Sequence, residues 1–210
     1  ENSFEIERAL AKIAVAFDGQ AEKIDGSELE TKQVPDLLMG RTLFAEKRLV
    51  IIKSLSEIKS PWNDFSQWVD KVSDDIQLVL VEPKPDKRTK TFKELQKVAD
   101  IKPFASWTER DIYAAEQWAI DEAKTLGFKL DNKLAHAVVA RTGADQWRLY
   151  HALEKLAVID DVNQETIDDI IERSPVENIF QLFETALKGD GVKIRQMIQT
   201  LEQTHDAYQL

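Results

Sequence analysis

The feature of this 210-residue sequence that most limits its fold is a pair of short, uninterrupted apolar runs. The first run is RLVIIK at residues 48–53, and the second is IQLVLVE at residues 76–82. A strand with water on one face alternates apolar and polar residues, whereas a strand buried on both faces is a continuous, largely β-branched run. Both runs therefore predict strands inside a largely parallel sheet.

Segments with helical spacing surround these two runs. An amphipathic helix begins at Asn2, a short strand is expected near Lys23, and a brief helix occupies residues 36–39. Apolar residues recur at helical spacing in 61–72 and again in 92–98, on either side of the second run. Helices that alternate with buried strands indicate an α/β domain with a parallel sheet.

The composition changes near Trp107. Residues 1–106 carry 17 Lys and Arg against 19 Asp and Glu, a net charge of −2, whereas residues 107–210 carry 11 against 19, a net charge of −8. The second part has no strand signal and shows helices that end at Gly127 and Gly143. We therefore predict an α/β domain at 1–106 and an all-α bundle after it.

The helical part is itself expected to divide. Ser174 and Pro175 interrupt the pattern after four predicted helices, and two further amphipathic helices follow them. This arrangement predicts a helical lid domain at 107–173 and the beginning of a further, truncated helical domain at 174–210.

Composition also excludes several classes of function. A net charge of −10 argues against a free-standing nucleic-acid-binding protein, because phosphate neutralisation needs clustered Lys and Arg. There is no cysteine, and the spacing of His136, His151 and His205 is not that of metal ligands. We expect no metal site and three surface histidines. No apolar run is long enough to span a membrane and no signal peptide is evident, so a cytoplasmic location is expected.

An α/β domain followed by a helical lid is the layout of AAA+ ATPases, so nucleotide chemistry has to be considered. The sequence has no G-x-x-x-x-G-K-[ST] loop to bind phosphate. Lys53 and Ser54 end the first apolar run, where an AAA+ strand would end in the Asp-Glu pair that serves magnesium and water. We expect no cofactor, although a strand and loop could precede Glu1 outside this sequence.

Five segments, taken in their order and spacing, resemble the delta subunit of the bacterial DNA polymerase III clamp loader. They are LFAEKRLVIIKSL, LVLVEPKPDKRTKTFKELQK, GADQWRLYHALEKLAV, ETIDDIIERS and ENIFQLFETALKGD. The resemblance implies two AAA+-like domains that bind no ATP and a third helical domain that joins a pentameric collar. It places a first strand before Glu1 and most of the collar domain after Leu210.

The same resemblance implies partners and a site. The partners are the beta sliding clamp, the gamma/tau and delta prime subunits of the loader, and primer-template DNA reached through the complex. Leu43 and Phe44 match the hydrophobic tip that the family inserts into the clamp, and Arg41 and Thr42 lie beside it. Arg41 replaces an apolar residue of the family pattern, which predicts a smaller or charge-supplemented contact. From the residues alone, Leu43 and Phe44 could instead cap the core of the sheet.

Two charged features have alternative interpretations. The basic run that contains Lys84, Lys87, Arg88 and Lys90 could face DNA phosphates or a neighbouring subunit, or it could be a solvated helix face. Arg148 lies where active AAA+ lids place an Arg that senses the γ-phosphate, but packing or a surface salt bridge explains it without a nucleotide.

The function predicted from the sequence is non-catalytic. It is that of a clamp-loader subunit that binds and opens the sliding clamp without hydrolysing ATP. One alternative is a working AAA+ ATPase whose phosphate-binding loop lies outside this sequence. A second alternative is a helical scaffold with no role in replication, which predicts no affinity for a sliding clamp.

Overall fold

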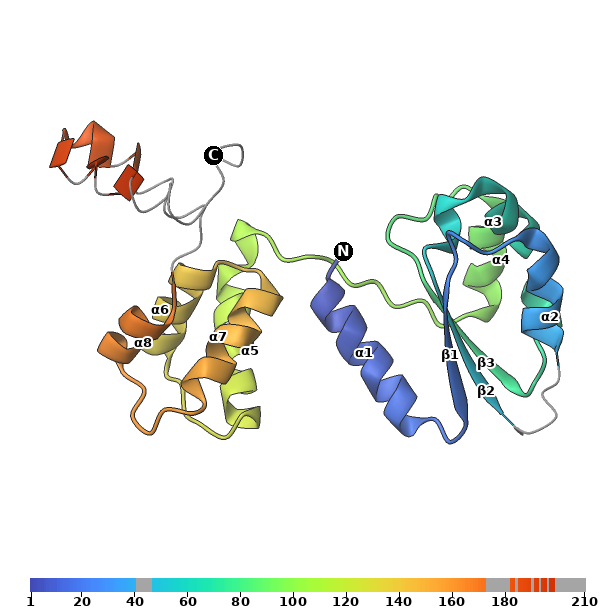
Figure 1. The fold of residues 1–210 in the computed structure, drawn as a ribbon, viewed down its shortest axis with the longest axis horizontal. Coiled ribbons are helices and arrows are strands. Elements are labelled where there is room, and N and C mark those ends of the chain that lie inside the picture. Colours follow the sequence, from blue (N-terminus) through green and yellow to red (C-terminus); the bar gives the residue numbers. More distant parts are fainter. Residues whose placement is uncertain are drawn as a thin grey trace. The chain divides into compact units, whose positions relative to one another are not determined.

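The computed structural model describes residues 1–40 and 47–172 and several residues between 182 and 198 (Figure 1). The chain divides into two compact units, an α/β unit of residues 3–105 and a second unit that starts at Ser106. None of the helices in the described ranges has the length and apolar character that a bilayer crossing requires.

The α/β unit is built on a three-stranded sheet. Strands β1 (Gln20–Asp25), β2 (Arg48–Lys53) and β3 (Ile76–Val81) lie in the order β1-β2-β3. Both strand pairs are parallel, with Arg48 beside Gln20 on one side and Ile76 on the other. The predicted parallel sheet is therefore confirmed. The expectation that the second run is buried on both faces is wrong, because β3 lies at the edge of the sheet, where Ile76 is buried but Gln77 is exposed.

Strand β2 is buried on both faces because helices cover each side of the sheet (Figure 1). Leu49 and Ile51 are fully buried and pack with Leu10 of α1 (Ser3–Ala16). Val50 and Ile52 are equally buried and share the opposite core with α2, α3 and α4. These three helices are α2 (Val34–Met39), α3 (Lys59–Phe65) and α4 (Lys90–Val98).

The helix expected over residues 61–72 is shorter than its apolar spacing suggested. Helix α3 ends at Phe65, and the 3₁₀ turn η3 (Val69–Lys71) follows it. The amide of Trp68 donates to the carbonyl of Phe65, so a tight three-residue turn replaces the helical ladder. This turn keeps Val69 in the core that contains Trp62 and Phe65, which explains why the apolar positions resemble one continuous helix.

The second unit is all-helical in its described residues up to 172. Its helices are α5 (Ile112–Thr125), α6 (Asn132–Thr142), α7 (Gln146–Leu156) and α8 (Gln164–Ile170). Asp131, Asp145 and Asn163 accept hydrogen bonds from the first turns of the last three helices, as N-caps do. Three alanines of α5 pack against the leucines of α7 in one core.

The predicted helix ends at Gly127 and Gly143 are confirmed, since both residues have positive φ values, 93° and 73°. Most of the predicted domain at 174–210 lies outside the described residues, and the described positions between 182 and 198 are helical or turn.

Candidate functional site

The segment that contains the proposed tip joins α2 to β2. Arg41, Thr42, Leu43 and Phe44 all lie outside the described residues, so their exposure is untested. Both ends of the segment are described. Gly40 closes α2, with its amide bonded to the carbonyl of Asp36 at 2.9 Å.

A single side chain spans the two ends of this segment. Arg48, the first residue of β2, donates from Nη1 to the carbonyl oxygen of Gly40 at 3.0 Å. Its Nη2 donates to the carboxylate of Glu22 on β1 at 2.8 Å. The Arg48 side chain is 14% exposed, and it lines a hollow between β1 and α2. The sequence analysis did not predict a role for Arg48, although a charged residue at the start of a buried strand indicates a specific polar contact.

The opposite edge of the sheet is where an AAA+ protein would bind nucleotide. At the end of β2, Lys53 forms an ion pair with Glu7 of α1 at 2.6 Å. Ser54 follows in the left-handed conformation, with a φ of 60°. An ammonium group that is already paired and a hydroxyl cannot supply the two carboxylates that magnesium binding and water activation need.

One carboxylate does lie at this edge of the sheet, but it is already hydrogen-bonded to backbone amides of the protein. Glu82, just after β3, accepts hydrogen bonds from the amides of Leu55 at 3.1 Å and Ser56 at 2.9 Å. Burial raises the pKa of the Glu82 carboxyl group, and these hydrogen bonds oppose that shift. Glu82 therefore anchors the 3₁₀ turn η2 (Leu55–Glu57) to the end of β3.

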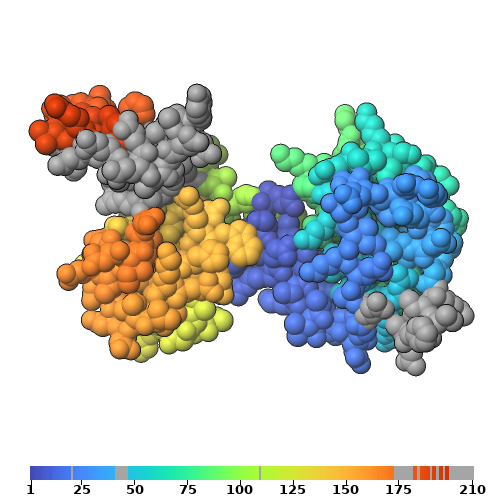
Figure 2. Space-filling view, viewed as in Figure 1, coloured from blue at the N-terminus to red at the C-terminus, as the bar shows by residue number. Residues whose placement is uncertain are grey.

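The predicted basic run forms the exposed loop after β3 and the start of α4, green in Figure 2. Arg88 pairs with Asp86 at 2.9 Å, and its hydrogen bonds lower the pKa of Asp86 to about 2. Glu94 pairs in turn with Lys97. Four exposed lysines have no ion pair with a described carboxylate: Lys84, Lys87, Lys90 and Lys93.

The remaining candidates lie in the helical unit. Arg148 is an exposed residue in the first turn of α7, where its amide donates to Asp145. His136 and His151 are exposed, and each has a ring nitrogen within hydrogen-bonding distance of a glutamate. His205 lies outside the described residues. In the described part of the chain, no three His, Asp or Glu side chains form a group that could hold a metal ion.

Comparison with known protein families finds a similarity that is confined to the α/β unit. Residues 15–105 match the family model described as DNA polymerase III, delta subunit. This range contains all three strands and the whole segment between α2 and β2. Over residues 15–105 the chain is therefore similar to the DNA polymerase III delta subunit. The delta-subunit match agrees with the resemblance seen in the sequence.

Solved structures extend the likeness beyond this delta-subunit region. The Bacillus subtilis DNA clamp loader delta protein (YqeN) is 18% identical with a TM-score of 0.68, covering 98% of this chain and 66% of that protein. Two mutants of Thermotoga maritima RuvB are 10% and 13% identical, with TM-scores of 0.47 and 0.46, over 72% of this chain and 52% of theirs. No curated protein matches the chain in sequence.

The likeness to the Bacillus subtilis delta protein bears on the fold. It supports the predicted arrangement of an α/β domain with a parallel sheet followed by a helical bundle. This chain spans 66% of the length of that delta protein.

Proposed function

We propose that this chain acts as a clamp-loader subunit that binds and opens the beta sliding clamp through Leu43 and Phe44. The delta-subunit match over residues 15–105 carries the proposal, because these two residues lie within it. In this proposal the segment between α2 and β2 offers an apolar pair to a pocket on the clamp, beside Arg41 and Thr42. The gamma/tau and delta prime subunits are the other partners in the loader.

Clamp binding by the full chain tests the tip directly. Burying two large apolar side chains contributes about 3–6 kcal/mol, so Leu43→Ala with Phe44→Ala should weaken binding by about two to four decades. Melting temperature should hardly change if the pair is exposed. A matched control replaces two exposed apolar residues of the helical unit, Tyr113 (74% exposed) and Val158 (81% exposed), with alanine.

The outcomes separate the tip from the alternative in which the pair caps the core. A large fall in melting temperature with clamp affinity preserved would assign Leu43 and Phe44 to the core, because truncating buried side chains costs several kcal/mol. No affinity for a sliding clamp in the unaltered chain would instead support the helical scaffold.

The second part of the proposal is that this subunit hydrolyses no ATP. Support comes from the carboxyl edge of the sheet, where Lys53 is paired with Glu7 and the Glu82 carboxylate is held by two backbone amides. We expect no magnesium-dependent ATP turnover by the full-length protein. Turnover that stops when magnesium is chelated would favour the working AAA+ ATPase.

The basic run is the proposed contact with primer-template DNA or a neighbouring subunit. Four amines without a described carboxylate partner form a local positive surface on a chain with a net charge of −10. Lys87→Glu with Lys90→Glu should weaken DNA binding by the assembled loader and reduce its salt dependence. A variant that binds DNA as before in a fully assembled loader would identify a solvated helix face, and a loader that fails to assemble would identify a subunit contact.

A further inference from the structure

Backbone and side-chain hydrogen bonds fix both ends of the segment between α2 and β2. Gly40 leaves α2 with no room for a side chain, since an added Cβ would lie 2.1 Å from the carbonyl oxygen of Asp36. The carbonyl of Leu38 accepts a hydrogen bond from the amide of Ser73, in the turn before β3, at 3.0 Å. The end of α2 is therefore tied to the start of the neighbouring strand.

Arg48 fixes the other end and joins it to the first. Its backbone amide donates to Asp75 at 2.9 Å, which anchors the start of β2 beside β3. Its guanidinium group reaches Gly40 and Glu22 at once, at 3.0 Å and 2.8 Å. A planar guanidinium can satisfy two acceptors in different directions, which the point charge of a lysine does less well. One largely buried side chain thus connects α2, β1 and β2.

We propose that Arg48 is the positioning residue of the clamp-binding tip, acting through the ends of the segment that carries Leu43 and Phe44. The inference rests on the proposed function. A connecting segment loses conformational entropy when it binds a partner. When its ends are already fixed it has less entropy to lose, so a larger share of the contact energy appears as affinity. Arg48 itself need not touch the clamp.

A double-mutant cycle tests this role on the full chain. Arg48→Met should weaken clamp binding by about threefold to tenfold, as expected when ordering costs of one or two side chains are added to binding. The same substitution should have no further effect when Leu43 and Phe44 are already alanine, because the tip it positions is gone.

The structure offers a matched control on the same strand. Lys53 is at the other end of β2 and forms an ion pair with Glu7, so Lys53→Met also removes an ion pair from the edge of the sheet. It should leave clamp affinity unchanged. If Arg48→Met does not fold, Glu22→Gln is the alternative variant. It weakens the ion pair with Arg48 at its more exposed partner and should also lower clamp affinity.

Limited trypsin digestion separates this inference from the proposed function. Cleavage after Arg41 should be several-fold faster in Arg48→Met and unchanged in Lys53→Met, whether or not the segment binds a clamp. Equal cleavage rates in Arg48→Met and the unaltered chain would overturn the positioning role. So would a loss of clamp affinity from Arg48→Met that is the same whether Leu43 and Phe44 are present or replaced by alanine. Unchanged clamp binding after alanine replacement of Leu43 and Phe44 would overturn the proposed function, and faster cleavage in Arg48→Met would still support the role of Arg48 at the ends.

Discussion

Two effects act in opposite directions on the pKa of Glu82. Burial raises the pKa of its carboxyl group above the ordinary 4.5, while the amides of Leu55 and Ser56 favour the charged form. The folded chain consequently keeps this proton to a higher pH than the unfolded chain does. The contribution of Glu82 to stability is therefore greatest below its unfolded pKa and falls as the pH rises through the raised pKa.

We expect Glu82→Gln to remove this pH dependence. Glutamine stays neutral and still offers one oxygen to the backbone amides, so no charge has to lose its hydration. Chemical unfolding between about pH 4 and pH 7 should show a smaller decline in stability with rising pH for the variant. Glu94→Gln is a control of opposite sign, because its hydrogen bond with Lys97 lowers the Glu94 pKa. An unchanged pH slope in Glu82→Gln would contradict the expectation.

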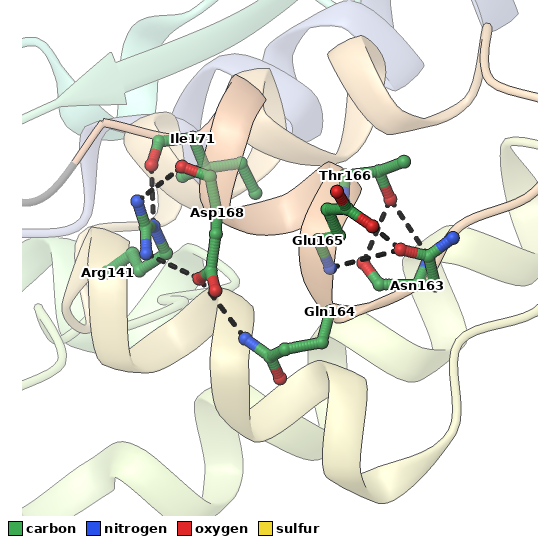
Figure 3. A network of polar contacts seen from close by, with 7 residues as sticks. All are labelled: Arg141, Asn163, Gln164, Glu165, Thr166, Asp168 and Ile171. Carbon is green, nitrogen blue, oxygen red and sulfur yellow. Dashed lines mark hydrogen bonds and ion pairs between the residues drawn. The ribbon is translucent and has the colours of Figure 1, made fainter.

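Among the elements, α8 depends on side chains that secure both of its ends (Figure 3). It has seven residues, too few for a helix that is stable alone. Asn163 accepts hydrogen bonds from the amides of Glu165 and Thr166 at its start. At its end, Arg141 of α6 donates to the carbonyls of Asp168 and Ile171 and pairs with the Asp168 carboxylate at 2.6 Å.

Arg141→Met should therefore destabilise the helical unit by about 2–3 kcal/mol, the usual range for losing hydrogen bonds from a charged donor. The Arg141 side chain is 13% exposed, so water replaces these bonds poorly. Thermal unfolding monitored by circular dichroism measures the change. Lys124→Met removes an exposed pair with Asp121 and should cost under about 1 kcal/mol. Equal effects of the two substitutions would show that Arg141 adds little to α8.

At the scale of the whole molecule, the described C-terminal residues present apolar side chains to solvent. Phe183, Leu187 and Val192 are 65%, 89% and 70% exposed. Large apolar side chains exposed to water offer surface for association. We expect weak self-association at high protein concentration, strengthened by salt that screens the net charge of −10.

Sedimentation measurements test this expectation. Phe183→Ser with Leu187→Ser should shift the chain toward the monomer. Val15→Ser with Val158→Ser replaces a residue of α1 that is 89% exposed and a residue of the turn after α7 that is 81% exposed, and it should leave the association unchanged. A strictly monomeric native chain at high salt would contradict the expectation.

The sequence by itself determined those parts of the fold that local patterns encode. The run at 48–53 required a strand buried on both faces, and β2 is that strand. Helix α6 begins after the N-cap Asp131 and ends at Gly143, which has a positive φ, so residues in or next to the helix set both of its ends. These features were predictable because periodicity, capping and backbone conformation depend on a few adjacent residues.

Only the tertiary structure decided which polar groups meet across the fold. Arg48 contacts Glu22, 26 positions away, and Glu82 reaches Leu55, 27 positions away. Helix α3 ends at Phe65 although its apolar spacing continues, because a tight turn also places Val69 in the core. No local pattern specifies such pairs, since they depend on which elements the sheet order brings side by side and on where each chain segment ends.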